Sequence, residues 1–113
     1  MKPMSIALRE LMAERGMTVS DLWIAAGLGG PSGVYRYLSG DRGRGVNSQS
    51  AEAIRKISRA LNVEPDYWME YRAYRVREIA KKHPDLASSV YDLLVNMARA
   101  HADFDEEGSD DAE

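Results

Sequence analysis

The segment that most constrains the fold runs from Thr18 to Gly40 and reads TVSDLWIAAGLGGPSGVYRYLSG. Thr18 is followed three residues later by Asp21, and such a pair is a signal for the N-terminus of a helix. Gly27 can adopt the left-handed conformation that ends this helix, and Pro31 suits the first turn of the next one. Apolar residues then recur at helical spacing, at Val34, Tyr37 and Leu38. The segment therefore predicts two short helices joined by a tight, glycine-containing turn.

Two short helices joined in this way form the motif that places a helix in the major groove of DNA. The segment from Thr18 to Leu28 resembles the helix-turn-helix of the Xre family, which is the Cro and phage-repressor type. The residues in register are Leu22, Ala26 and Gly27. The run from Ser50 to Val63 resembles the fourth helix of that family and the valine that closes it. The likeness extends over about residues 6–68, and it implies an all-α, five-helix domain that binds double-stranded DNA without a cofactor.

The composition argues against several other classes of protein. The chain has 113 residues and no cysteine, which excludes a disulfide framework and a thiolate metal site. His83 and His101 are far apart in the sequence and lack the spacing of metal ligands, so no metal site is expected. Neither a catalytic triad nor a phosphate-binding glycine loop is recognisable, so we do not expect the protein to be an enzyme. Without an apolar run long enough for a membrane span or a signal peptide, the sequence predicts a cytoplasmic protein.

The net charge of −3 is unevenly distributed along the chain. Residues 103–113 contain seven acidic residues and no basic one. The remaining residues hold all 15 basic residues against 11 acidic ones, which gives a net charge of +4. Between Arg36 and Arg59 there are six basic residues and only two acidic ones. The part of the chain that contains the motif is therefore basic, as DNA binding requires.

Apolar periodicity predicts further helices on both sides of the motif. A first helix spans about residues 5–15 with Ile6, Leu8, Leu11 and Met12 on its apolar side, and Ser50 is expected to cap a fourth helix. A fifth helix is expected from Pro65 to about Lys82, with Tyr67, Tyr71 and Tyr74 on one side, and a sixth from Pro84. The predicted domains are a DNA-binding domain at 1–83, a C-terminal dimerisation helix at 84–102 and a disordered acidic tail at 103–113.

The resemblance implies which side chains meet DNA. In the family, residues at the start of the second motif helix face the base edges, and by position these are Pro31, Ser32, Gly33, Tyr35 and Arg36. Arg36 is the first candidate for direct readout, because a guanidinium group can bind guanine with two hydrogen bonds. Phosphate contact is the alternative role of Arg36, and Tyr35 could instead be partly buried. Arg42 and Arg44 follow in a glycine-rich loop, where they can contact phosphates or a narrow minor groove.

The C-terminal helices carry more apolar surface than a five-helix domain needs. The predicted dimerisation residues are Leu86, Val90, Leu93, Leu94 and Met97, together with part of the face from Tyr67 to Ile79. A homodimer would allow two half-sites to be read, which is usual for this motif. The alternative is that both helices complete the core of the monomer.

Taken together, the residues favour a sequence-specific transcriptional regulator, namely a repressor that binds a palindromic operator as a homodimer. Two alternatives stay open at this stage. One is an antitoxin that masks a toxin and regulates its own synthesis, and the other is a protein-interaction module. The expected partners are double-stranded DNA and a second copy of the chain. A protein partner, either a toxin or RNA polymerase, is a further alternative, and no association with a membrane is expected.

Overall fold

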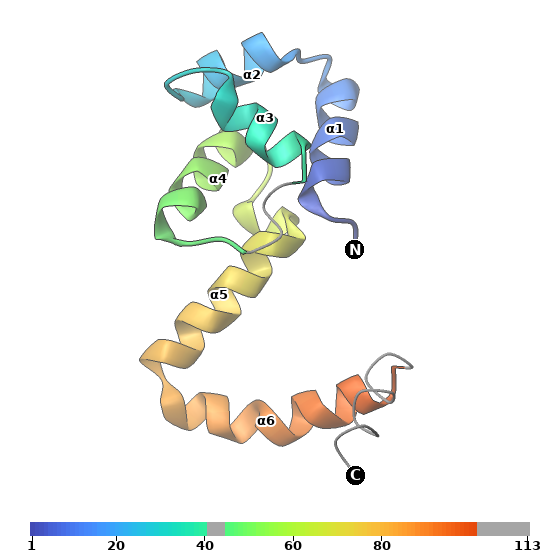
Figure 1. Cartoon of the computed structure of the whole chain (residues 1–113), viewed down its shortest axis with the longest axis vertical. Helices are drawn as coiled ribbons and strands as arrows, with labels where there is room; N and C mark the ends of the chain where they lie inside the picture. Colours follow the sequence, from blue (N-terminus) through green and yellow to red (C-terminus); the bar gives the residue numbers. More distant parts are fainter. Residues whose placement is uncertain (41–44, 102–113) are drawn as a thin grey trace. The chain divides into compact units, whose positions relative to one another are not determined.

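The computed structural model describes residues 1–40 and 45–101 of the chain. Its elements, in order, are α1 (Met4–Arg15), α2 (Val19–Ala26), α3 (Ser32–Leu38), α4 (Ser48–Leu61), the 3-10 helix η2 (Pro65–Tyr67), α5 (Met69–Lys82) and α6 (Pro84–Arg99) (Figure 1). The described residues form helices, turns and loops and contain no strand, so the prediction of an all-α fold is confirmed. Arg42, Arg44 and the acidic segment 103–113 lie outside these described ranges.

The chain divides into two compact units, Met1–Val76 and Arg77–Glu113, and α5 contributes residues to both. In the first unit, α2 packs against α4 and α1 packs against α3. Among the described residues of this unit, every helix from α1 to α4 contributes to one buried apolar cluster. Its fully buried members are Leu8, Leu22, Val34, Ala51, Ile54, Ile57, Leu61 and Trp68. This single core is what holds the two motif helices in place.

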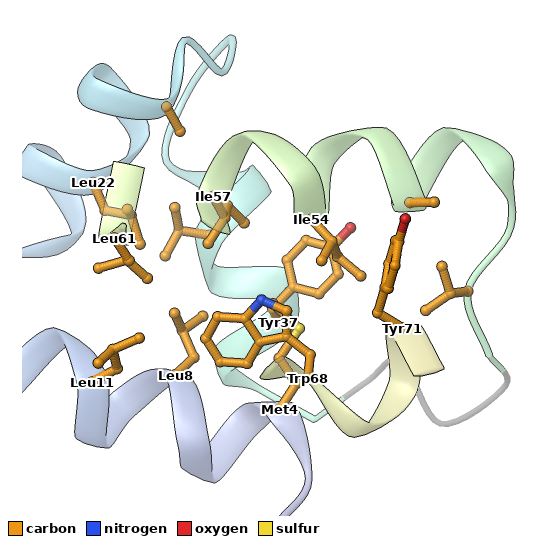
Figure 2. Close-up of a cluster of buried hydrophobic side chains, with 14 of the residues drawn as sticks. Met4, Leu8, Leu11, Leu22, Tyr37, Ile54, Ile57, Leu61, Trp68 and Tyr71 are labelled. Atoms are coloured by element: carbon orange, nitrogen blue, oxygen red, sulfur yellow. The ribbon is translucent and has the colours of Figure 1, made fainter. Parts of the chain in front are cut away.

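Trp68 is the largest side chain of that core. Figure 2 shows its ring lying between side chains contributed by α1 and α4. The indole N–H donates to Ser58 Oγ at 2.8 Å, and the Ser58 hydroxyl donates to the Ile54 carbonyl oxygen at 2.6 Å. Both buried polar groups therefore have partners, which removes the cost of burying them. These bonds fix the chain after α4 against the body of the domain.

The fourth helix begins earlier than predicted. Ser50 was expected to be its cap, but the cap is Asn47, whose Oδ1 accepts the Ser50 N–H at 2.8 Å. The Ser50 hydroxyl oxygen in turn accepts the Asn47 N–H at 2.9 Å, so the two residues form a reciprocal capping box. Because Ser50 is a residue of the first turn, its side chain is buried rather than exposed at the helix end. The predicted cap at Ser50 is therefore wrong by three positions.

The predicted fifth helix is interrupted near its start. Residues Pro65–Tyr67 form the 3-10 turn η2, Trp68 is extended with φ −98° and ψ 132°, and α5 begins only at Met69. Tertiary contacts of Trp68 override the local helical signal here. The interruption also turns Tyr67 away from the side that it was expected to share with Tyr71 and Tyr74, since Tyr67 is 44% exposed and the other two are 8% exposed.

The beginning of α5 is attached to the beginning of α1. Both carboxylate oxygens of Glu70 accept the backbone N–H of Met4, at 2.9 and 3.1 Å. This bond satisfies one of the free N–H groups of the first turn of α1, where Met4 is buried. Ile6 was predicted to lie on the apolar side of this helix, but it is 47% exposed, and Met4 takes the expected place in the core. Glu70, Tyr71 and Tyr74 together determine which face of α5 turns inward.

No helix in the described ranges is both long enough and apolar enough to cross a membrane.

Candidate nucleic-acid interface

The first motif helix, α2, begins with the predicted cap. Thr18 Oγ1 accepts the Asp21 N–H at 3.0 Å, and Asp21 Oδ2 accepts the Thr18 N–H at 3.0 Å. The hydrogen bond with the Thr18 backbone lowers the pKa of Asp21 the most, and the hydrogen bond with the Thr18 side chain lowers it further. Two free N–H groups at the helix start are thus satisfied by residues that lie only three positions apart in the sequence. The prediction of a helix start at Thr18 is confirmed.

The turn between the motif helices also follows the local signals. Gly27 is left-handed, with φ 74° and ψ 31°, and its N–H donates to the Ile24 carbonyl oxygen. The Leu28 N–H donates to the Trp23 carbonyl oxygen, which completes a glycine-terminated helix end. The chain then passes to Pro31, whose carbonyl oxygen accepts the N–H groups of Val34 and Tyr35. Pro31 therefore starts α3 as its N-terminal flanking residue, where proline does not interrupt any helical bond.

The second motif helix, α3, has one buried and one exposed face. Val34 is fully buried and Tyr37 is 3% exposed. The Tyr37 hydroxyl donates to the Ser50 carbonyl oxygen at 3.4 Å, which connects α3 to the start of α4. Arg9 of α1 donates to the Leu38 carbonyl oxygen at 3.1 Å and holds the other end of α3. The orientation of α3 about its own axis is thereby fixed by α1 and α4.

The exposed face of α3 contains three of the residues that the resemblance assigned to DNA. Ser32, Tyr35 and Arg36 are all exposed, and their spacing of three and four residues places them on one side of a helix. Tyr35 is 56% exposed, so the alternative that it is buried does not hold. No acidic side chain in the described ranges forms an ion pair with Arg36. This face, Ser32–Tyr35–Arg36, presents two hydroxyl groups and one guanidinium group to solvent.

Gly33 does not belong to that face. A Cβ atom built on Gly33 would lie 3.2 Å from Leu28 Cδ1, so its missing side chain points toward the turn. Leu28 is half-buried against the core. The absence of a side chain at Gly33 thus lets α3 approach the turn closely, a reason that the sequence alone did not reveal.

An open cleft of about 470 Å³ lies beside the exposed face of α3. One wall is formed by Ser32, Gly33 and Arg36, and the other is formed by Asn47, Gln49 and Ser50 at the start of α4. Gln49 is exposed and adds an amide group that was not among the predicted site residues. An Asn-x-x-Ser capping box, recognised in the sequence, would have placed Gln49 in the first turn of α4.

The remaining predicted site residues are two arginines and a set of apolar residues of the C-terminal helices. Arg42 and Arg44 fall in the segment that the structure does not describe. Of the predicted dimerisation residues, five are on α6: Leu86, Val90, Leu93, Leu94 and Met97. Val90 is half-buried, and the other four are between 49% and 57% exposed. Within the described ranges, no three His, Asp or Glu side chains are grouped so that they could hold a metal ion.

The comparisons with known proteins agree with this geometry. Residues 7–72 match the model of the Cro/C1-type HTH DNA-binding domain, and they include α2, α3, the turn between them and both walls of the cleft. None of the curated proteins and none of the solved structures matches the chain. The matched residues are more than half of the sequence. The chain therefore belongs to the family of Cro/C1-type helix-turn-helix DNA-binding domains.

Proposed function

We propose that the protein is a sequence-specific transcriptional repressor that binds a palindromic operator as a homodimer. The observation that carries this proposal is the exposed face Ser32–Tyr35–Arg36 on a helix whose opposite face is fully packed. A rigid helix that presents hydroxyl and guanidinium groups is suited to hydrogen bonding with base edges in the major groove. Repression follows when the bound protein occupies promoter DNA.

Within this proposal, the residues of α3 have different tasks. Arg36 is the side chain for bidentate recognition of guanine, and Ser32 and Tyr35 contact neighbouring bases or sugar-phosphate groups. Gln49 lines the same cleft as Arg36, which supports a role for its amide group in the same contact. Arg42 and Arg44 supply phosphate contacts that are independent of sequence. Gly33 has no side chain to contact DNA, and a Cβ atom built on it would point toward Leu28.

Dimerisation is assigned to α6. One helix-turn-helix reads only a few base pairs, and two copies related by a two-fold axis read two half-sites. The five residues Leu86, Val90, Leu93, Leu94 and Met97 supply an apolar surface for the second copy. Exposed apolar side chains that gather on one helix are suited to an interface.

Selection of bound duplexes from a random DNA library tests the proposal. Purified protein at near-physiological salt is incubated with the library, and the retained duplexes are sequenced. The proposal predicts an enriched motif with two-fold symmetry, whose half-sites are separated by about 10 base pairs or a multiple of this. Absence of any enriched motif, from protein shown to be helical by circular dichroism, would contradict sequence-specific binding. An enriched motif without symmetry would contradict the dimeric operator alone.

A further inference from the structure

Among the described residues, no carboxylate lines the cleft beside α3. The lining residues include the Arg36 guanidinium group, the Gln49 amide group and serine hydroxyl groups, which can all donate hydrogen bonds. Three other clefts each include an acidic side chain, namely Glu70 in one, Glu64 in the second, and Glu64 with Asp66 in the third. Of these four clefts, the one at the candidate interface is therefore the one that suits a negatively charged occupant.

The lack of acidic side chains extends beyond the cleft itself. Residues 22–40 and 45–51, which include α3, the turn before it and the start of α4, contain no aspartate and no glutamate. The first acidic residue of α4 is Glu52, which forms an ion pair with Arg55 at 3.2 Å. By contrast, α1, α5 and α6 each contain two acidic residues. An anion that approaches α3 therefore meets little repulsion from the described side chains.

Both helices that border the cleft carry a cationic side chain. Arg36 of α3 lines the cleft, and Lys56 of α4 follows Ala53, another lining residue, by three positions. At about 100° per residue, Lys56 lies within about 60° of both Gln49 and Ala53 around α4, so it continues the same wall. Neither Arg36 nor Lys56 forms an ion pair with an acidic residue in the part of the chain that the structure describes. These two positive charges are therefore available to an anion.

The complementary negative charge is present in the same chain. Residues 103–113 contain seven acidic side chains and no basic one, whereas the rest of the chain has a net charge of +4. A segment of this length can extend to at most about 36–40 Å, and the seven residues of α3 correspond to about 11 Å. The acidic segment 103–113 is therefore long enough to follow the cleft from α3 to the start of α4.

Covalent attachment favours this segment over an acidic molecule in solution. A group that belongs to the same chain as its binding site acts at an effective concentration of the order of 1 mM, so even a weak contact is populated. Guanidinium and ammonium groups bind carboxylates through charge-assisted hydrogen bonds, and they bind the phosphates of DNA in the same way. Carboxylates of the acidic segment and phosphates of DNA therefore compete for Arg36 and Lys56.

From these features, we propose that the acidic segment 103–113 occupies the cleft when DNA is absent and competes with DNA for the exposed face of α3. This proposal rests on the DNA-binding part of the proposed function and names a regulator of that site. DNA binds only to the fraction of protein whose cleft is open, so the apparent dissociation constant is the intrinsic one divided by this fraction. The same factor applies to every DNA sequence. The segment therefore lowers affinity and leaves sequence preference unchanged.

A spin label tests the contact in the absence of DNA. The chain has no native cysteine, so a nitroxide attached to Ser109→Cys is the only label, and it broadens the NMR signals of amides that come close to it. The expected result is broadening at Ser32, Tyr35 and Arg36 at about 50 mM salt, which is lost at about 500 mM salt because ion pairs are screened. The matched control carries the same label and an amide in place of each carboxylate of the segment: Asp103→Asn, Asp105→Asn, Glu106→Gln, Glu107→Gln, Asp110→Asn, Asp111→Asn and Glu113→Gln.

Broadening of the α3 signals by the native segment, and not by the neutralised one, supports the contact. Broadening confined to α5, where Arg75 and Lys82 are exposed cations, would overturn the proposal. The absence of any salt-dependent broadening would also overturn it. Circular dichroism checks that each labelled protein is folded. Because this experiment needs no DNA, failure of the contact is distinguishable from failure of the library selection.

Affinity for DNA provides a second arm. The neutralised chain, without a label, should bind the selected duplex and a scrambled duplex of the same composition more tightly than wild type, by the same factor of about 3- to 30-fold at about 50 mM salt. Loss of negative charge by itself also increases affinity for DNA, so the comparison on the scrambled duplex is repeated in an Arg36→Ala background. If the segment contacts Arg36, the gain in affinity should be smaller in that background. An equal gain in both backgrounds would assign the effect to net charge and overturn the contact.

Discussion

Gly33 faces Leu28 across the turn of the motif, because a Cβ atom built on Gly33 would lie 3.2 Å from Leu28 Cδ1. The exposed residues of α3 therefore exclude Gly33, although it stands between Ser32 and Tyr35 in the sequence. Leu28 Cδ1 is the end of a flexible side chain and can shift by a few tenths of an ångström.

Gly33→Ala should accordingly be tolerated. Alanine favours a helix over glycine by about 1 kcal/mol, and displacement of Leu28 offsets part of this gain. We expect the free energy of unfolding to increase by less than about 1 kcal/mol, as measured by urea denaturation. Affinity for the selected duplex should remain within 2-fold of wild type. A large loss of DNA affinity in a stable Gly33→Ala protein would place Gly33 against the bases.

Acid should weaken the start of α2. The pKa of Asp21 is lowered in the folded protein, so the stabilisation from this carboxylate is present above its ordinary pKa of 3.8 and is lost as pH falls through the lowered value. Comparison of wild type with Asp21→Asn by thermal unfolding checks this sign. The difference in Tm between them should be larger at pH 7 than at pH 2. An equal difference in Tm at both pH values would show that the charge of Asp21 does not stabilise the folded protein.

Arg42→Ala and Arg44→Ala should weaken binding to all DNA sequences. Each contact with a phosphate contributes about 0.9 to the slope of log affinity against log salt, because counterions are released. Each substitution is expected to reduce that slope by about one unit and to leave the sequence preference unchanged. Binding isotherms between 50 and 300 mM salt measure the slope. An unchanged slope for both variants would mean that the loop does not contact phosphates.

Leu93→Asp should produce monomers. A carboxylate at position 93, in the centre of the apolar residues of α6, would be buried in the dimer interface without an ion-pair partner. The free energy lost by burying this charge exceeds the free energy that the apolar contact contributes. Sedimentation equilibrium at matched concentrations measures the mass. Ser88→Asp is the matched control, since it adds the same charge to the exposed polar side of α6 and should leave the dimer intact. An unchanged mass for Leu93→Asp would exclude the apolar residues of α6 from the dimer interface.

Local signals in the sequence were sufficient to predict where the first helix of the motif begins and ends. The Thr18–Asp21 cap and the left-handed Gly27 depend on neighbouring residues, and both appear as predicted. The cap of α4 was misplaced because Asn47 and Ser50 are both capping residue types and bond to each other. The break at Trp68 was missed because a contact with Ser58, distant in sequence, overrides the helical pattern there.

For the candidate interface, the resemblance to the Xre family supplied Ser32, Tyr35 and Arg36, and helical spacing puts them on one face. Spacing could not reveal that Gly33 faces Leu28, because that depends on the path of the turn. It also could not bring Gln49 beside Arg36, since the position of α4 relative to α3 depends on packing through Tyr37. The sequence therefore predicted contacts within an element better than contacts between elements.

If the exposed face of α3 reads the operator, removal of the Arg36 guanidinium group must weaken specific binding, and Arg36→Ala measures this loss. Dissociation constants are measured for wild type and variant on the selected duplex and on a scrambled duplex of the same composition. Loss of a bidentate contact should reduce affinity for the selected duplex by about 1–3 kcal/mol, or roughly 5- to 150-fold, with little change on scrambled DNA. A folded Arg36→Ala protein that binds the selected duplex as tightly as wild type would contradict the account.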